Sequence, residues 1–400
     1  MEIGRVRRVR TVGIICEYHP FHNGHLYHLT QAKKELQCEA AVCVMSGAFV
    51  QRGEVALFDK WERARAALAY GADLVLELPD YVVLQSAGQF ADGGIQLLDA
   101  LGVVDAVSFG SECGDLQLLQ DIASVLAEEP MPFQTALKNA LGKGMGYPAA
   151  LCQAFETCWP QKDIRALLCP NNLLAANYLA ALQRLGSRML PHTLKRQATG
   201  HHDMELKGTI ASGTAIRRAL LQGRTCRDVL PGKSVYSCQY RMERLEPLLL
   251  GYLRIVDAAQ LGQLPGMEQG LANRMLRAAR QAVSWPEYIA EAVTKRYTAS
   301  RIRRLTAAAL LGFRLGAKLD YVRILGLTPR GAQLLRTAKQ VCPFPIITKT
   351  ADAYLPQDSM FWYDIRATDL AALACSDTRR RIAGADYRTS PVFVKNTESI

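Results

Sequence analysis

Apolar runs and amphipathic segments alternate through the first half of the chain. Apolar runs typical of buried parallel strands occur at Val12 to Cys16, Ala40 to Ser46, Asp73 to Leu78 and Ala106 to Phe109, and Arg188 to Lys195 reads as a further strand. Apolar residues recur at helical spacing in Lys60 to Tyr70, Ser86 to Leu101, Asp115 to Ala127 and Asn172 to Leu185. This alternation predicts an α/β fold with a Rossmann-like, doubly wound parallel sheet, in which Arg188 to Lys195 is the last strand. Residues 130–170 read as an irregular or helical insertion.

From about residue 223 the pattern becomes helical. Helical apolar spacing, with Arg and Lys on the opposite faces, is found in Met242 to Ala258, Met267 to Val283, Ile289 to Leu311 and Arg330 to Val341. We therefore predict two domains, a catalytic domain over residues 1–222 and a mainly α-helical domain over residues 223–400.

The charged residues divide the chain at nearly the same place. The whole sequence has a net charge of +11, but residues 1–200 carry 18 Lys and Arg against 20 Asp and Glu, whereas residues 201–400 carry 30 against 17. The basic second half is suited to holding a polyanion, and a merely solvated basic surface is the alternative.

A histidine-rich turn follows the first predicted strand. Pro20, Asn23 and Gly24 interrupt the apolar run, and helical spacing then begins, so that His22 and His25 lie at a helix N-terminus. Such a terminus favours anions, and two imidazoles add hydrogen-bond donors for a phosphate. Two alternatives are histidines scattered in a turn and a zinc site. No cysteine pair at ligand spacing stands nearby to support the zinc site.

Three further groups of residues are candidates for binding anions. Ile210 to Arg217 begins another helix, with Ser212 or Thr214 as its cap. Ser46, Gln51 and Arg52 follow the carboxyl end of a predicted strand, where ligands bind in such sheets. Arg301, Arg303 and Arg304 form a basic ridge that suits a nucleic-acid backbone or is simply solvated. The GxxxxGK[ST] and strand-linked GxGxxG phosphate loops do not occur.

Composition fits a cytoplasmic protein. The eleven cysteines form no CxxC pair, which favours reduced thiols. The apolar run after the basic N-terminus is shorter than the roughly 7–15 residues of a signal peptide. No segment approaches the roughly 18 apolar residues of a membrane span.

Several motifs together resemble a known family. FHNGH after an apolar strand is similar to the HxGH signature of the nucleotidylyltransferase superfamily, and IASGTAIR resembles its second signature. EYHPFHNGHLYH, MSGAFVQRGE, FGSE, PNN and the ITK of residues 347–349 resemble the bacterial tRNA(Met) cytidine acetate ligases. The family pattern has Asn where this chain has His19.

The resemblance implies an ATP-dependent enzyme that makes acetyladenylate and then acetylates the wobble cytidine of elongator methionine tRNA. It implies that His22 and His25 are catalytic and hold the ATP phosphates, and that Mg²⁺ accompanies ATP, although no aspartate pair identifies its ligands. The implied ATP-binding residues are Ile15, Cys16, Glu17, Tyr18, His19, Pro20, Phe21, His22, Asn23, Gly24, His25, Leu26, Tyr27, His28, Gly110, Asn171, Arg196, Gln197, Ser212, Thr214 and Arg217.

Acetate and methionine tRNA are implied only by this resemblance. We place the acetate pocket at Ser46, Gln51 and Arg52, and the tRNA contacts at Arg301, Arg303 and Arg304. Two other classes remain open: an adenylyltransferase that acts on a small phosphorylated metabolite, and a non-catalytic RNA-binding protein with a relic nucleotide site.

Overall fold

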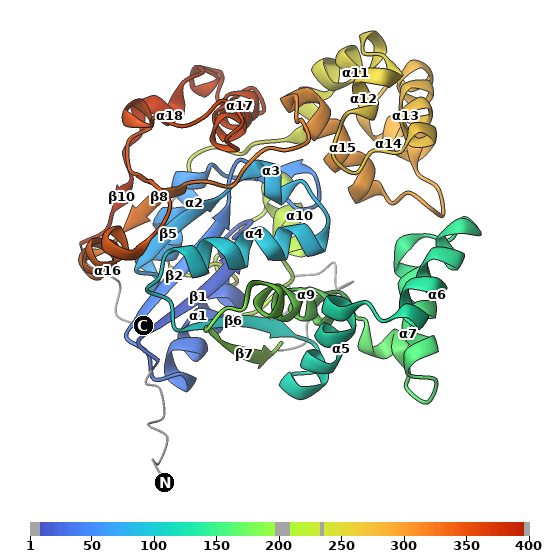
Figure 1. Cartoon of the computed structure of the whole chain (residues 1–400). Coiled ribbons are helices and arrows are strands. Elements are labelled where there is room, and N and C mark those ends of the chain that lie inside the picture. The colour runs from blue at the N-terminus through green and yellow to red at the C-terminus, as the bar shows by residue number, and fades with distance from the viewer. Residues whose placement is uncertain (1–8, 197–208, 233–235, 396–400) are drawn as a thin grey trace.

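The computed structural model describes residues 9–196, 209–232 and 236–395. Its centre is an eight-stranded sheet in the order β10-β8-β5-β2-β1-β6-β7, with β9 paired to β8 (Figure 1). The first half contributes β1 (Thr11–Cys16), β2 (Ala40–Ser46), β5 (Leu74–Leu78), β6 (Ala106–Ser111) and β7 (Leu190–Lys195). These five strands are mutually parallel. The predicted doubly wound α/β sheet is confirmed.

The sheet is apolar on both faces because helices cover both. Every residue of β2 is buried, and successive side chains point to opposite sides. Val42 and Val44 belong to the core cluster shared with α4 and α9, whereas Cys43 and Met45 belong to the cluster shared with α1 and α2. Unbroken apolar runs in this half therefore mark strands buried on both faces.

The helices of the first half lie close to their predicted positions. The segment 130–170, read as irregular or helical, is helical and forms α6 to α8. The helices are α1 (Asn23–Glu35), α2 (Lys60–Ala69), α3 (Asp80–Val83), α4 (Ala87–Ala100), α5 (Leu116–Glu128), α6 (Met131–Gly142), α7 (Tyr147–Cys158), α8 (Ile164–Leu167), α9 (Pro170–Leu185) and α10 (Gly213–Leu221). A short hairpin, β3 (Phe49–Val50) with β4 (Glu54–Val55), follows β2.

Most of the second half is helical, as predicted. Its α-helices are α11 (Glu246–Ile255), α12 (Ala258–Gly262), α13 (Gln269–Gln281), α14 (Trp285–Ala292), α15 (Ala299–Leu311), α16 (Pro329–Val341), α17 (Phe361–Ala372) and α18 (Ala385–Arg388). Short 3₁₀ helices occur at Met242–Leu245, Thr350–Asp352 and Thr378–Arg380. Helices α11 to α15 form a lobe beside the sheet (Figure 1).

The prediction of one helix over Ile289 to Leu311 is wrong. The chain turns between α14 and α15, where the Thr294 hydroxyl accepts hydrogen bonds from the main-chain N–H groups of Arg296 and Tyr297, at 3.1 and 3.0 Å. Thr298 then caps α15. Threonine hydroxyls that bind nearby main-chain groups compete with helix continuation, which explains the break.

The prediction that Arg188 to Lys195 is the last strand is also wrong. Among the described residues beyond residue 222, three strands occur, namely β8 (Val322–Leu327), β9 (Ile346–Ile347) and β10 (Val392–Phe393). Strand β8 pairs antiparallel with β5 and extends the sheet past it. The assignment of separate functions to residues 1–222 and 223–400 stays a prediction. The sheet itself does not divide at residue 222, because it takes strands from both sides of that position.

A buried cluster of charges joins the two halves. Lys60 Nζ lies 2.6 Å from Glu77 and 2.8 Å from Asp386, and Arg323 lies 3.2 Å from Glu77 and 2.6 Å from Asp386. All four side chains are at most 5% exposed. Because buried charges are tolerated only when paired, this cluster fixes α18 and β8 against α2 and β5.

None of the helices in the described ranges is long and apolar enough to span a membrane.

Candidate functional site

The histidine-rich turn forms the N-terminus of α1. His22 is the N-cap residue, and its Nδ1 accepts a hydrogen bond from the main-chain N–H of Gly24 at 3.1 Å. His25 Nδ1 accepts from the N–H of His22 at 3.3 Å, and the two rings stack with centroids 3.7 Å apart. Because each Nδ1 is an acceptor, the neutral tautomer of both rings carries its proton on Nε2. The Nε2–H of His22 is then available as a donor, whereas the His25 ring also has a hydrogen bond to the main chain of Pro20.

The second signature lies directly against this turn. Ser212 caps α10, and a Cβ added to Gly213 would lie 3.7 Å from His22 Nε2. Arg217, one turn into α10, donates to the His19 carbonyl at 2.9 Å and to the Thr214 hydroxyl at 3.1 Å. The N-termini of α1 and α10 therefore converge on His22, which creates a strongly anion-attracting position.

The histidines of this site are electrically neutral at physiological pH. Burial lowers the pKa of His22 to about 3, helped by Arg196 and Arg217, and lowers the pKa of His28 to about 4, helped by His192 and Arg196. Burial also holds the pKa values of His19 and His25 well below their ordinary value. The imidazoles therefore supply neutral donors, and the positive charge of the site comes from Arg196 and Arg217.

The low pKa of His22 predicts a pH dependence of stability. Below the ordinary imidazole pKa of about 6.5 the unfolded chain binds a proton that the folded chain excludes, so the free energy of unfolding falls as the pH falls. Between pH 7 and pH 5 this costs about 2 kcal/mol for a folded pKa of about 3. Urea unfolding should show a loss that is about 2 kcal/mol smaller in His22→Asn than in the wild type, because the buried His19, His25 and His28 still contribute in both proteins.

The comparison with His22→Asn is needed because Asp80 acts in the opposite direction. Burial, together with the charge of Glu77, raises the Asp80 pKa to about 7. Its protonation in the folded state therefore adds stability as the pH falls. A wild-type curve parallel to that of His22→Asn between pH 7 and pH 5 would contradict the neutral state of His22.

His28 begins a chain of hydrogen bonds that leads to the surface. Its Nε2 lies 3.0 Å from the Ser108 hydroxyl, which lies 3.0 Å from His192 Nδ1. His192 Nε2 in turn lies 3.1 Å from the half-exposed Glu35 carboxylate. These contacts fix the orientation of the His28 ring against β6 and β7.

Other residues of the stretch from Ile15 to His28 have structural roles. Tyr18 and Phe21 are buried and pack edge to face, with ring centroids 4.8 Å apart. The Asn23 amide donates to the carbonyls of Thr209 and Asp228, at 2.8 and 2.9 Å, and so holds the segments on both sides of α10. Asn23 is predicted to bind ATP, and its side-chain amide nitrogen already makes these two bonds.

His19, where the family pattern has Asn, is buried in the turn. Its Nδ1 accepts from the Leu57 N–H at 3.0 Å, and its carbonyl accepts from Arg217. The side chain thus joins the turn to the segment before α2. An asparagine oxygen is an acceptor of the same kind, so the exchange preserves this chemistry.

The end of β6 brings Gly110 and Arg196 together. A Cβ added to Gly110 would lie 3.2 Å from Arg196 Cγ, so the glycine leaves room for this side chain. Gln197, the neighbouring predicted residue, lies outside the described residues.

The FGSE and PNN motifs meet at the N-terminus of α9. The Glu112 carboxylate accepts from the Asn171 amide at 2.6 Å and from the Asn172 N–H at 2.7 Å. Asn172 Oδ1 accepts in return from the Glu112 N–H at 2.9 Å. Sequence reasoning singled out Asn171 alone, although the two motifs contained the signal for Glu112 and Asn172.

Arg63 is the main site residue that sequence reasoning missed. This arginine is fully buried, and it donates to the carbonyls of Glu17 at 2.7 Å and Ser46 at 3.1 Å, to the Ser46 hydroxyl at 3.3 Å, and to the carbonyl of Gly47. It therefore ties the ends of β1 and β2 together and places a buried cation there, close enough to Asp59, Asp80 and Glu17 to interact with their carboxyl groups. Nothing in the helical repeat of α2 distinguishes Arg63 from its neighbours.

The predicted acetate residues lie beside Arg63. Ser46 is buried at the end of β2, and Gln51 and Arg52 form the turn of the β3–β4 hairpin. The Glu17 carboxylate accepts from the Gln51 N–H at 2.6 Å, which holds the hairpin next to the histidine turn. The structure thus brings these three residues close to the ends of β1 and β2.

The predicted arginine ridge of α15 packs on the same hairpin. Arg304 donates to the Gln51 carbonyl at 3.2 Å, and Arg303 lies 3.1 Å from the Glu54 carboxylate. Arg301 pairs with Glu268 at 2.8 Å. Each arginine of the ridge therefore has an intramolecular partner, so the ridge also supports the hairpin.

In residues 9–196, 209–232 and 236–395, no group of three or more His, Cys, Asp and Glu is placed to hold a metal ion. We accordingly assign no protein ligands to Mg²⁺.

Comparison with known proteins identifies the family. A family model described as HIGH Nucleotidyl Transferase matches residues 9–386. The tRNA(Met) cytidine acetate ligase of Thermoanaerobacter sp. (strain X514) is 37% identical, over 94% of this chain and 98% of its own length. That of Acetivibrio thermocellus is 34% identical, over 96% of this chain and 100% of its own.

Solved structures agree with these sequence relatives. The apo crystal structure of Thermotoga maritima TmcAL superposes with a TM-score of 0.90 at 32% identity, covering 97% of this chain and 100% of that one. The same protein bound with alpha-thio ATP gives a TM-score of 0.88 at 32% identity over the same shares. The chain therefore belongs to the HIGH nucleotidyl transferase family, among the tRNA(Met) cytidine acetate ligases and their relatives.

Proposed function

We propose that this protein is a tRNA(Met) cytidine acetate ligase, which uses ATP to activate acetate and transfers the acetyl group to the wobble cytidine of elongator methionine tRNA. The observation that carries the proposal is the convergence of the α1 and α10 N-termini on His22 Nε2, with Arg217 beside them. Relatives over nearly the whole chain bear this name, and one of them has been crystallised with an ATP analogue.

In the first step, an acetate oxygen attacks the α-phosphorus of ATP. A new P–O bond forms, the bond to the β-phosphate bridge breaks, and pyrophosphate leaves with the electron pair. Negative charge builds on the phosphate oxygens, where the Nε2–H groups of His22 and His25 are suited to donate. Ser212, Thr214 and Arg217 at the start of α10 would hold the β- and γ-phosphates. Mg²⁺ would enter with the nucleotide.

We place acetate near Ser46, Gln51 and Arg52. Arg63 donates to the Ser46 oxygen, so the Ser46 hydroxyl proton is directed away from the guanidinium and is able to bind a carboxylate. The buried charge of Arg63 makes the ends of β1 and β2 attractive to an anion. Burial raises the Glu17 pKa, so this carboxyl gives up its proton less readily than an exposed glutamate.

In the second step, the cytidine exocyclic amine attacks the acetyl carbonyl. An amide bond forms, the bond to AMP breaks, and the amine loses one proton. We propose that the basic residues beyond residue 222 hold the tRNA, with Arg301, Arg303 and Arg304 among its backbone contacts, and that the enzyme works in the cytoplasm, where tRNA is found.

Incubation with tRNA, ATP and sodium acetate tests the proposal. Mass spectrometry of the digested tRNA should detect acetylcytidine at the wobble position of elongator methionine tRNA only when all three substrates are present. Initiator methionine tRNA is the matched control and should remain unmodified. If pyrophosphate exchanges into ATP in an acetate-dependent way but no acetylcytidine forms, the result would support the formation of acetyladenylate and contradict cytidine as the acceptor.

A further inference from the structure

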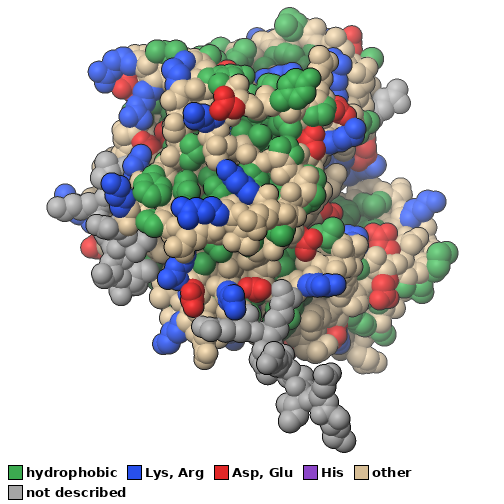
Figure 2. Space-filling model, turned by 60° about the vertical axis from the view of Figure 1, so that its left-hand side comes forward, with side chains coloured by type: hydrophobic (Ala, Val, Ile, Leu, Met, Phe, Trp, Pro, Cys, Tyr) green, Lys and Arg blue, Asp and Glu red, His purple; other side chains and the backbone are tan. Residues whose placement is uncertain are grey.

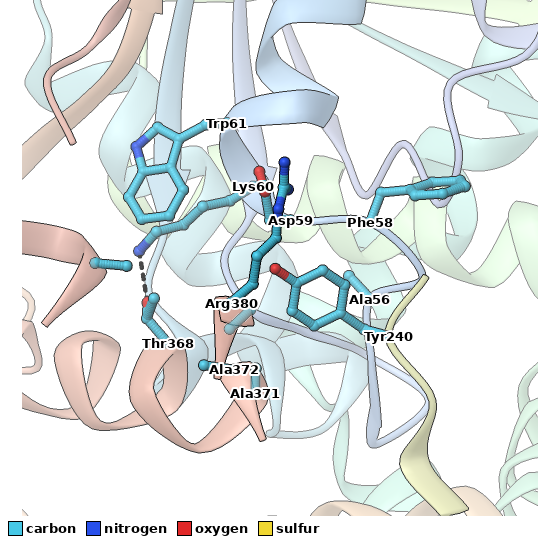
Figure 3. A pocket seen from close by; sticks show the side chains of 12 residues that line it. Ala56, Phe58, Asp59, Lys60, Trp61, Tyr240, Thr368, Ala371, Ala372 and Arg380 are labelled. Atoms are coloured by element: carbon cyan, nitrogen blue, oxygen red, sulfur yellow. Dashed lines mark hydrogen bonds between the residues drawn. The ribbon is translucent and has the colours of Figure 1, made fainter. Parts of the chain in front are cut away.

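A pocket lies beside the segment of residues 58–59, which leads into α2. The segment at Phe58 and Asp59 forms one wall, and the start of α2, Tyr240 and helix α17 form others. Figure 3 shows the rings of Trp61 and Tyr240 in this pocket, with the Arg380 side chain between them in that view. The pocket adjoins the proposed acetate site, because Arg63 Nε donates to the Phe58 carbonyl at 3.0 Å.

The charged groups at the floor of the pocket are already paired with one another. Lys60 Nζ pairs with Glu77 and Asp386, and it donates to the Thr368 hydroxyl at 2.9 Å (Figure 3). A small anion would therefore gain little from Lys60. What the pocket presents to a ligand is the half-buried rings of Trp61 and Tyr240.

A run of arginines borders the same pocket. Arg379, Arg380 and Arg381 follow one another, and Arg380 lines the pocket itself. The side chains of Arg379 and Arg380 are 88% and 43% exposed. Arg380 lies 3.5 Å from Glu62, a long and partly exposed contact. Figure 2 brings forward the side on which α17 and α18 lie, and shows Lys and Arg side chains spread among apolar ones over that face.

Aromatic rings beside guanidinium groups are suited to single-stranded nucleic acid. Bases stack on aromatic side chains, while arginines hold the neighbouring phosphates. A metabolite of the size of acetate would not need two rings. The combination therefore favours an unpaired base of RNA.

We propose that this pocket receives an unpaired nucleobase of the RNA acceptor, stacked on Trp61 and Tyr240, and that Arg379, Arg380 and Arg381 hold the adjoining phosphates. This inference rests on the proposed function and adds a location for the RNA. It brings the RNA to the segment that Arg63 joins to Ser46.

Binding of fluorescently labelled tRNA and of a ten-nucleotide oligocytidylate, followed by anisotropy, tests the pocket. Tyr240→Leu should weaken binding roughly 5- to 150-fold, the range expected for loss of one stacked base. Tyr240→Phe keeps the ring and should bind as the wild type does. Arg380→Gln should weaken binding and reduce the slope of log affinity against log salt by about one.

Arg184→Gln is the matched control, because Arg184 is an exposed arginine on α9, in the first half of the chain and away from the pocket. Its affinity and salt slope should remain those of the wild type. Acetate-dependent pyrophosphate exchange, which requires no RNA, should persist in Tyr240→Leu and so show that this variant is folded. If Tyr240→Leu does not fold, RNA should still quench the fluorescence of the wild type more than that of Trp61→Phe.

The outcomes separate this inference from the proposed function. Wild-type affinity in both Tyr240→Leu and Arg380→Gln, or equal quenching in Trp61→Phe and the wild type, would overturn the pocket and leave the acetate ligase intact. A wild type that binds neither RNA would overturn the RNA acceptor itself, and with it the pocket. Loss of RNA binding with exchange retained supports both.

Discussion

Replacing His25 by alanine is expected to lower acetate-dependent exchange of pyrophosphate into ATP by at least roughly 10²- to 10³-fold, the usual cost of losing one donor to a developing oxyanion. The substitution removes the Nε2–H of His25. It also removes the Nδ1 that accepts from the His22 N–H and the ring that stacks on His22, so the second imidazole loses its support. The measurement is exchange of labelled pyrophosphate with the purified variant.

His22→Asn is the control that separates catalysis from helix capping. Asparagine is a good N-cap residue and keeps an acceptor for the Gly24 N–H, so the start of α1 should be preserved. The imidazole donor is nevertheless lost, so exchange should fall as it does in His25→Ala while the free energy of unfolding changes little. Full exchange by either variant would contradict the phosphate role of these histidines.

The strands and helices of the first half could be predicted because each is specified locally. A run such as Ala40 to Ser46 is apolar throughout, and α4 and α5 have regular apolar spacing between capping residues. The predicted positions of these elements are confirmed. Strand β8 was missed because its short apolar run lies among helical segments, and periodicity alone does not separate a buried strand from a buried helix.

The histidine turn and the start of α10 could also be linked from sequence, because both are helix N-termini that follow recognisable motifs. The partners of individual side chains could not. Asn23 binds the carbonyls of Thr209 and Asp228, which are separated from it by 186 and 205 positions in the sequence. Arg63 binds the ends of two strands. Local patterning contains no information about such contacts, which arise only when the sheet assembles.

The arginines of α15 illustrate the same limit. Spacing alone predicted a ridge that faces RNA, whereas Arg304 contacts the hairpin that carries Gln51 and Arg52. Burial lowers the Arg304 pKa to about 10, so its environment differs from that of a solvated arginine. If α15 also contacts RNA, then a movement of α15 would be transmitted to the proposed acetate pocket through the hydrogen bond from Arg304 to the Gln51 carbonyl.

Asp386→Asn is expected to cause the largest loss of stability, a decrease in the free energy of unfolding of about 3–5 kcal/mol. The substitution leaves the buried cations Lys60 and Arg323 with a single ionised partner, Glu77, in a cluster whose side chains are at most 5% exposed. It also loosens α18 from α2, and therefore the contact between the second half of the chain and the first. Urea unfolding followed by circular dichroism measures the change.

Asp358→Asn is the matched control, because Asp358 pairs with Lys318 at 2.9 Å where both side chains are exposed. Exposed pairs contribute little, so this variant should unfold at the same urea concentration as the wild type. An equal loss in the two variants would mean that the buried cluster does not join the halves. A loss confined to Asp386→Asn would mean that residues 1–222 depend on α18 and β8 for their stability, even if catalysis and RNA binding are divided between the two halves.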